Sequence, residues 1–131
     1  MHARMQMART LSEFHYTTLF IDGAAFANTE RLHDELAFKL GLPSSYVGDF
    51  DALFDCLSSI GDTQRNLCSH WESRTGKRLV LQIRDFAPDE VDADLLLAFT
   101  DTVAEANTAL DDTGATNRIW IEYMAAEDTN S

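Results

Sequence analysis

Three short runs of β-branched and aromatic residues recur along the chain, and segments with helical periodicity separate them. The runs are YTTLFI at 16–21, LVLQI at 79–83 and RIWIEY at 118–123. Two helical segments lie between the first and second runs, and one lies between the second and third. Strands that alternate with helices are typical of a parallel sheet with right-handed crossovers. We therefore predict an α/β fold, a small three-stranded parallel sheet packed with helices in the order β-α-α-β-α-β.

Apolar side chains at helical spacing mark the three helices. The first helix ends at Gly41, and its apolar stripe consists of Leu32, Leu36 and Leu40. The second helix begins at Asp49, which can cap it, and its stripe consists of Phe50, Leu53, Phe54, Leu57 and Ile60. A proline followed by two acids at 88–90 predicts the start of the third helix, whose stripe consists of Val91, Leu95, Phe99, Val103, Ala106 and Leu110.

The length of 131 residues fits one domain whose core is large enough to fold without disulfides or a structural metal. We expect residues 1–15 to form a disordered leader, residues 16–124 a single domain and residues 125–131 a disordered tail. The polar stretch 61–76 is interpreted as a connection between the second helix and the second strand.

Acidic residues outnumber basic residues by 22 to 10, and the formal net charge is -12. This charge opposes the binding of nucleic acid and of anionic membrane surfaces, so we predict neither. No apolar run approaches the ~20 residues that span a membrane, and the first residues lack the apolar segment of a secretory signal. Cys56 and Cys68 lack zinc-ligand spacing and suit a reducing cytoplasm. We expect a cytoplasmic protein with no metal and no cofactor.

The second helix carries carboxylates opposite its apolar stripe. Asp51 and Asp55 are four residues apart and share one face, and Asp49 stands before them at the predicted cap position. No Lys or Arg occurs between Lys39 and Arg65. Taken alone, such a pattern is typical of a solvated helix face.

We give the other polar residues of this region structural roles and assign no catalytic residue. His33 lies beside the leucine stripe of the first helix and is expected to be partly packed. Cys56 is expected to be a small core residue, because no basic residue is near it in sequence. A calcium loop starting at Asp49 does not fit, because Leu53 stands at the third ligand position and the central glycine is missing.

The segment LHDELAFKLGLPSSYVGDFDALFDCL, at 32–57, resembles the core segment of the barstar family of ribonuclease inhibitors. The likeness needs no gap and is carried above all by the Asp-Ala-Leu-aromatic-Asp-Cys-Leu run at 51–57. A second block, LVLQIRDF at 79–86, resembles the family's middle strand and its exit. The resemblance implies an inhibitor, not an enzyme, that plugs the active-site cleft of a guanyl-specific, barnase-like ribonuclease.

In that family, the segment matching 45–55 enters the enzyme cleft, where acidic side chains take the place of substrate phosphates. Asp51 and Asp55 match two family aspartates, and Asp101 falls near a third acidic contact. The implied partner is a basic ribonuclease or nuclease-type toxin, and we expect the free chain to be a monomer. The implied partner-binding residues are Ser45, Tyr46, Val47, Gly48, Asp49, Asp51, Phe54, Asp55 and Asp101.

Three residues depart from the family pattern: Ser45 replaces a tyrosine, Val47 a glycine and Phe54 a tryptophan. The 61–76 connection is also longer. An alternative is therefore an immunity or regulatory module of the same fold for a different basic toxin. A less favoured alternative is a metal-dependent hydrolase built on Asp51, Asp55 and Asp101, which would lack a basic group for a phosphate substrate.

Overall fold

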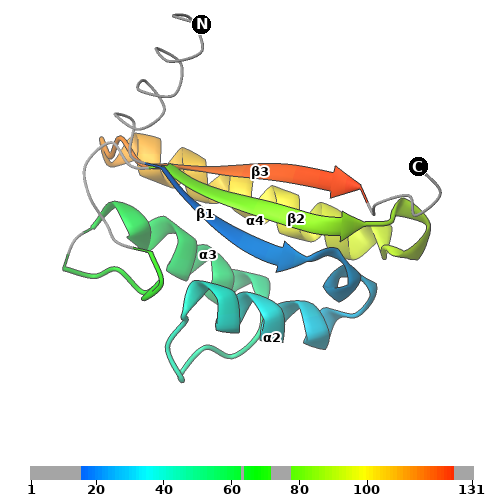
Figure 1. Cartoon of the computed structure of the whole chain (residues 1–131). Helices are drawn as coiled ribbons and strands as arrows, with labels where there is room; N and C mark the ends of the chain where they lie inside the picture. Colours follow the sequence, from blue (N-terminus) through cyan, green and yellow to red (C-terminus); the bar gives the residue numbers. More distant parts are fainter. Residues whose placement is uncertain (1–15, 63, 72–77, 126–131) are drawn as a thin grey trace, which may run out of the picture.

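The computed structural model describes residues 16–62, 64–71 and 78–125. The predicted leader, almost all of the predicted tail and part of the 61–76 connection lie outside these residues. Strands β1 (Tyr16–Asp22), β2 (Arg78–Phe86) and β3 (Arg118–Ala125) form one parallel sheet in the order β1-β2-β3. Helices α2 (Thr29–Leu40) and α3 (Phe50–Ser58) connect β1 to β2, and α4 (Ala93–Asp112) connects β2 to β3 (Figure 1). The predicted fold class and element order are confirmed.

The two faces of the sheet differ in burial, because successive side chains of a strand point to opposite faces. One face is apolar and packs with the leucines of α2, α3 and α4 in a single hydrophobic cluster; it contributes Ile21, Leu79, Leu81, Ile83 and Ile119. The other face, called the open sheet face below, carries Tyr16, Thr18, Phe20, Asp22, Arg78, Val80, Gln82, Arg84, Arg118, Trp120 and Glu122. Tyr16 and Trp120 are about half exposed on it.

Side chains and a glycine define the ends of the first two helices. The Asn28 side chain caps α2 by accepting a hydrogen bond from the Arg31 backbone N at 3.0 Å. Gly41 ends α2 in the left-handed conformation, with φ of 67°, which favours glycine. Asp49 caps α3, as predicted, and its Oδ1 accepts from the Ala52 backbone N at 2.7 Å. Among the described residues, no helix is long and apolar enough to cross a membrane.

The start of α4 differs from the prediction. Pro88–Glu90 forms a separate 3-10 turn, and α4 begins at Ala93, so Val91 lies outside the helix. The carboxylate of Asp92 accepts hydrogen bonds from the backbone N atoms of Asp94 and Leu95. Because this side chain satisfies two N–H groups that lack partners within the helix, Asp92 sets the helix start more strongly than the preceding proline.

The described part of the 61–76 connection completes the core. Cys68 and Trp71, to which the sequence assigned no role, are buried. The backbone N atoms of Ser69 and His70 donate to the carbonyl oxygens of Gly41 and Leu40 at 3.1 and 3.0 Å. The connection therefore satisfies carbonyl groups at the C-terminal end of α2, which have no partner within the helix.

Candidate functional site

Eight of the nine predicted binding residues lie in one segment, 45–55, which joins α2 to the first two turns of α3. Ser45 and Val47 are exposed at the loop, Val47 with 73% of its surface accessible. The backbone N of Tyr46 donates to the Pro43 carbonyl at 2.9 Å and closes a turn. Gly48 has φ of 73°, which lets the chain reverse directly before the cap of α3.

The buried His33 of α2 contacts this loop and helps to fix its position. The Nδ1 atom of His33 on α2 is hydrogen-bonded to the phenolic oxygen of Tyr46, and the Tyr46 hydroxyl lies 3.5 Å from the Asp49 carbonyl oxygen. The His33 ring also packs edge-on against Phe50, with 4.7 Å between centroids. His33 thus contacts both the loop and the first residue of α3. The position of His33 beside the leucine stripe predicted partial packing but did not reveal this link.

The hydrogen bonds fix the tautomer of His33. Its Nε2 atom is buried and has no hydrogen-bond partner. A buried N–H without a partner is costly, so we assign the proton to Nδ1, which then donates to Tyr46 while the tyrosine hydroxyl is free to donate to Asp49. Burial lowers the pKa of His33, and the nearby charges of Asp49 and Asp34 only partly oppose this effect. Burial also raises the pKa of Tyr46 above its usual value, so both rings are neutral near pH 7.

Asp51 and Asp55 project from α3 into solvent, one helical turn apart. In the part of the chain that the structure describes, neither carboxylate has an ion-pair partner. Three basic residues pair with other acids: Arg31 with Asp22, Lys39 with Glu35 and Arg118 with Asp111. The negative charge of this face is therefore available to a partner.

Phe54 and Asp101 occupy different settings from the two aspartates. Phe54 is only half-buried and packs against the hydrophobic cluster, so part of its ring is accessible beside Asp55. Asp101 is exposed on α4, the helix against which α3 packs, and no described hydrogen bond or ion pair joins it to the 45–55 segment. The structure brings together the residues of 45–55 and leaves Asp101 on a neighbouring helix. Over the described residues, no three His, Cys, Asp or Glu side chains are grouped so that they could hold a metal ion.

Comparison with known proteins identifies the chain's family. The family described as "Barstar (barnase inhibitor)" matches residues 16–122, from the first strand into the last. The chain belongs to the barstar family. The match confirms the resemblance carried by 32–57 and 79–86. In the structure, these two segments form α2, the loop after it, α3 and β2.

One relative is similar over a shorter stretch. The Bacillus subtilis (strain 168) protein named "Putative ribonuclease inhibitor YrdF" is 50% identical to this barstar-family chain over 40 residues. The matched stretch covers 30% of this chain and 44% of that protein. The chain therefore matches less than half the length of this relative.

Proposed function

We propose that this barstar-family chain inhibits a basic ribonuclease by filling its active-site cleft with the loop 45–49 and the acidic face of α3. The observation that carries the proposal is the pair of exposed carboxylates, Asp51 and Asp55, without ion-pair partners among the described residues. A cleft that binds RNA phosphates presents cationic side chains, and carboxylates can form charge-assisted hydrogen bonds with them. No cofactor is required for such a blocking role.

The loop supports this proposal because it is held in place before any partner arrives. The Tyr46 hydroxyl is hydrogen-bonded to His33, and the Tyr46 backbone N donates a hydrogen bond to the Pro43 carbonyl oxygen. Asp49 caps α3. A surface that is already ordered loses less conformational entropy on binding than a flexible one. Ser45 and Val47 at the exposed tip are then presented to the enzyme together with the carboxylates of α3.

The test is a binding titration of the chain against a barnase-like ribonuclease, with Asp51→Ala and Asp55→Ala as variants. We expect each variant to lose at least about 2 kcal/mol of binding free energy, because desolvated charges at the centre of an interface are typical hot spots. Asp112→Ala is the matched control, since it removes one exposed carboxylate from the far end of α4. Equal affinity for the wild type and all three variants contradicts the proposal.

A second candidate is an immunity or regulatory module for a different basic toxin. The residues that depart from the family pattern favour it, because Ser45 and Val47 lie at the exposed tip of the loop, where they would meet a partner first. Co-purification from the native host distinguishes the two candidates. An equimolar basic protein that is not a barnase-like ribonuclease supports the second candidate.

The enzyme alternative has its own test. We expect no nuclease or phosphatase turnover with magnesium or manganese, because Asp51 and Asp55 lie on an exposed helix face rather than in a concave pocket. Metal-stimulated turnover that Asp51→Asn abolishes contradicts the inhibitor proposal. The free, buried thiols of Cys56 and Cys68 are compatible with action in a reducing cytoplasm.

A further inference from the structure

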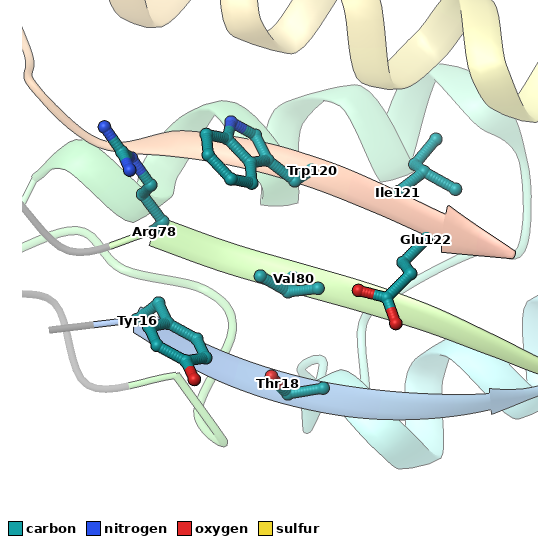
Figure 2. Close-up of a pocket in the computed structure, with 7 residues that line it drawn as sticks. All are labelled: Tyr16, Thr18, Arg78, Val80, Trp120, Ile121 and Glu122. Atoms are coloured by element: carbon teal, nitrogen blue, oxygen red, sulfur yellow. The ribbon is translucent and has the colours of Figure 1, made fainter. Parts of the chain in front are cut away.

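The open sheet face is unusual for a sheet whose strands are all parallel. Such sheets are ordinarily covered on both faces, but the helices of the described residues pack on one side alone (Figure 1). Figure 2 shows the other side, where Tyr16, Arg78, Trp120 and Glu122 surround a shallow hollow of about 370 Å³. Val80 forms part of its lining, between the two outer strands.

We propose that the open sheet face binds the same face of a second copy of this chain, which gives a sheet-on-sheet dimer. This proposal revises the expectation of a monomer and does not depend on the proposed function. The first argument is the order of residues along the strands. The register defines three rows across the face: Tyr16, Arg78 and Arg118; Thr18, Val80 and Trp120; and Phe20, Gln82 and Glu122.

The two-fold axis of this dimer lies between the two sheets, perpendicular to the strands and level with the middle row. Rotation about this axis places the two middle rows against each other and the first row of each copy against the third row of the other, so the face is self-complementary. The rotation places Trp120 against Trp120 of the second copy and Val80 against its counterpart. It also places Tyr16 against Phe20 of the second copy. Within each copy, the Arg84 guanidinium lies over the Phe20 ring, 3.6 Å from its centroid. Aromatic rings therefore meet aromatic rings, and two twisted sheets can pack face to face in this way about 10 Å apart.

The same rotation pairs opposite charges. Arg78 in the first row comes to face Gln82 of the second copy, and Arg118 comes to face Glu122, one strand or about 4.8 Å farther along the row. Because Arg118 is already paired with Asp111, we assign the contact with Glu122 of the second copy to Arg78. The Glu122 carboxylate accepts a hydrogen bond from Gln82 Nε2 at 2.9 Å and leans from β3 toward β2, as Figure 2 shows. The Arg78 guanidinium lies over the Trp120 ring, 4.6 Å from its centroid. Two symmetric Arg78–Glu122 contacts between copies fit these positions.

The distribution of charge also permits association of a chain whose net charge is -12. The open sheet face carries Arg78, Arg84 and Arg118 together with Asp22 and Glu122, whereas Asp51 and Asp55 belong to a helix on the opposite side of the sheet. In a sheet-on-sheet dimer the acidic helices of the two copies point away from each other, and their repulsion is screened beyond about 8 Å at physiological salt. The dimer leaves the loop 45–49 and α3 free.

The size of the face predicts a weak dimer. Strands of seven registered residues spaced about 4.8 Å apart give a face of roughly 23 by 14 Å. With side-chain relief, the buried area lies near the lower limit of about 1,000 Å² for a specific interface. We therefore expect a dissociation constant of about 1–100 µM.

Sedimentation velocity of the full chain at roughly 1 to 500 µM tests the dimer, a range that brackets the affinity expected from its size. We expect a shift from monomer to dimer that Trp120→Glu shifts to at least tenfold higher concentration. Phe38→Glu is the matched control, because Phe38 is 71% exposed on α2. A monomer at every concentration overturns the proposal, including the case in which residues 1–15 lie against the sheet and shield Trp120. A dimer that Phe38→Glu disrupts and Trp120→Glu does not also overturns it.

A charge exchange between copies tests the register. Arg78→Glu brings an acid close to Glu122 of the second copy, and Glu122→Arg brings an arginine close to Arg78 and Arg118 of the second copy, so each variant alone should dimerise at least tenfold more weakly. A mixture of the two variants restores an opposite-charge contact between positions 78 and 122 on both sides of a mixed dimer, and we expect this mixed dimer to be tighter than the dimer of either variant alone. A contact within one chain cannot be restored by mixing. Mixed variants that remain monomeric therefore overturn the proposed two-fold arrangement.

Discussion

The Nδ1 atom of His33 is hydrogen-bonded to the hydroxyl of Tyr46, so a buried residue of α2 holds the loop that leads into the acidic helix α3. The two residues are 13 positions apart in the chain. This contact joins the hydrophobic core to the proposed binding surface. Changes in the core at His33 should therefore reach the loop, and changes in the loop should alter stability.

Tyr46→Phe should lower the free energy of unfolding by about 1–2 kcal/mol, because it leaves a buried N–H of His33 without an acceptor. Urea unfolding followed by circular dichroism measures the change. Tyr123→Phe is the control, since Tyr123 is 44% exposed and its hydroxyl makes no hydrogen bond in the described residues; its effect should stay within about 0.5 kcal/mol. Equal stability of the two variants contradicts the role of the Tyr46 hydroxyl.

Stability should fall as the pH is lowered below about 6.5, the usual pKa of histidine in an unfolded chain. Burial lowers the pKa of His33 in the folded chain, so in this range the unfolded chain binds more protons than the folded one. The free energy of unfolding then decreases with falling pH, by at most about 1.4 kcal/mol per pH unit from this one group. Unfolding measured between pH 7.5 and 5.5 tests the direction of the slope.

A pair of histidine variants identifies the group responsible for the slope. His33→Gln should flatten the pH dependence in this range even if it lowers stability overall. His70→Gln is the comparison variant, because it removes an exposed histidine of the connection and leaves the contact between His33 and Tyr46 intact. A slope that persists in His33→Gln assigns the titration to another group.

The sequence predicted the elements whose signals are local. The three strand runs, the leucine stripe of α2 and the Asp49 cap of α3 depend on residues close together in the chain, and the structure has all of them. The predicted start of α4 was wrong because the cap at Asp92, which the prediction did not consider, begins the helix after the 88–90 segment. Its backbone N also donates to the Phe26 carbonyl at 3.0 Å, a contact that sequence spacing does not reveal.

One part of the candidate site could be predicted from helical periodicity, and another part depends on contacts between segments that are distant in the sequence. Asp51 and Asp55 share a face through helical periodicity alone, so their placement followed from their spacing. The bond between His33 and Tyr46 depends on how α2 packs beside the loop, which no local pattern encodes. The burial of Cys68 and Trp71 likewise depends on the docking of the connection against the end of α2.

Asp55→Ala should slightly stabilise the free chain, although we expect it to weaken partner binding. The change relieves the repulsion between Asp51 and Asp55 and introduces the best helix former, which together amount to about 0.5–1 kcal/mol. Asp51→Ala should be close to neutral, because Asp51 lies in the first turn of α3, where a negative charge interacts favourably with the helix dipole. Thermal unfolding of both variants checks the order; marked destabilisation by Asp55→Ala contradicts it.

The two cysteines should be inert toward thiol reagents while the chain is folded. Both are buried, and the Cys68 Sγ lies 3.4 Å from the Cys56 carbonyl oxygen. Burial raises the pKa of the Cys68 thiol to about 12 and also raises that of Cys56, so very little reactive thiolate is present near neutral pH. Reaction with a disulfide reagent should be slow in buffer and fast in urea. Rapid reaction in buffer contradicts the burial of these thiols.

Association with a basic partner should slow steeply as salt is added, while dissociation changes much less. Lys and Arg are absent from 40–64 and 85–117. The segments that include α3 and α4 therefore carry acidic residues with no basic residue among them. Such a field accelerates the encounter with a cationic surface, and ions screen it within about 8 Å at physiological ionic strength. Contacts already formed in the complex are shielded from solvent and respond weakly to salt.

Stopped-flow association rates from about 20 to 500 mM salt measure the effect. Asp55→Ala should lower the slope, because it removes a charge from the proposed binding surface, and Asp112→Ala should lower it less. Association rates that stay constant with salt contradict steering and indicate that the acidic surface contributes to solubility instead.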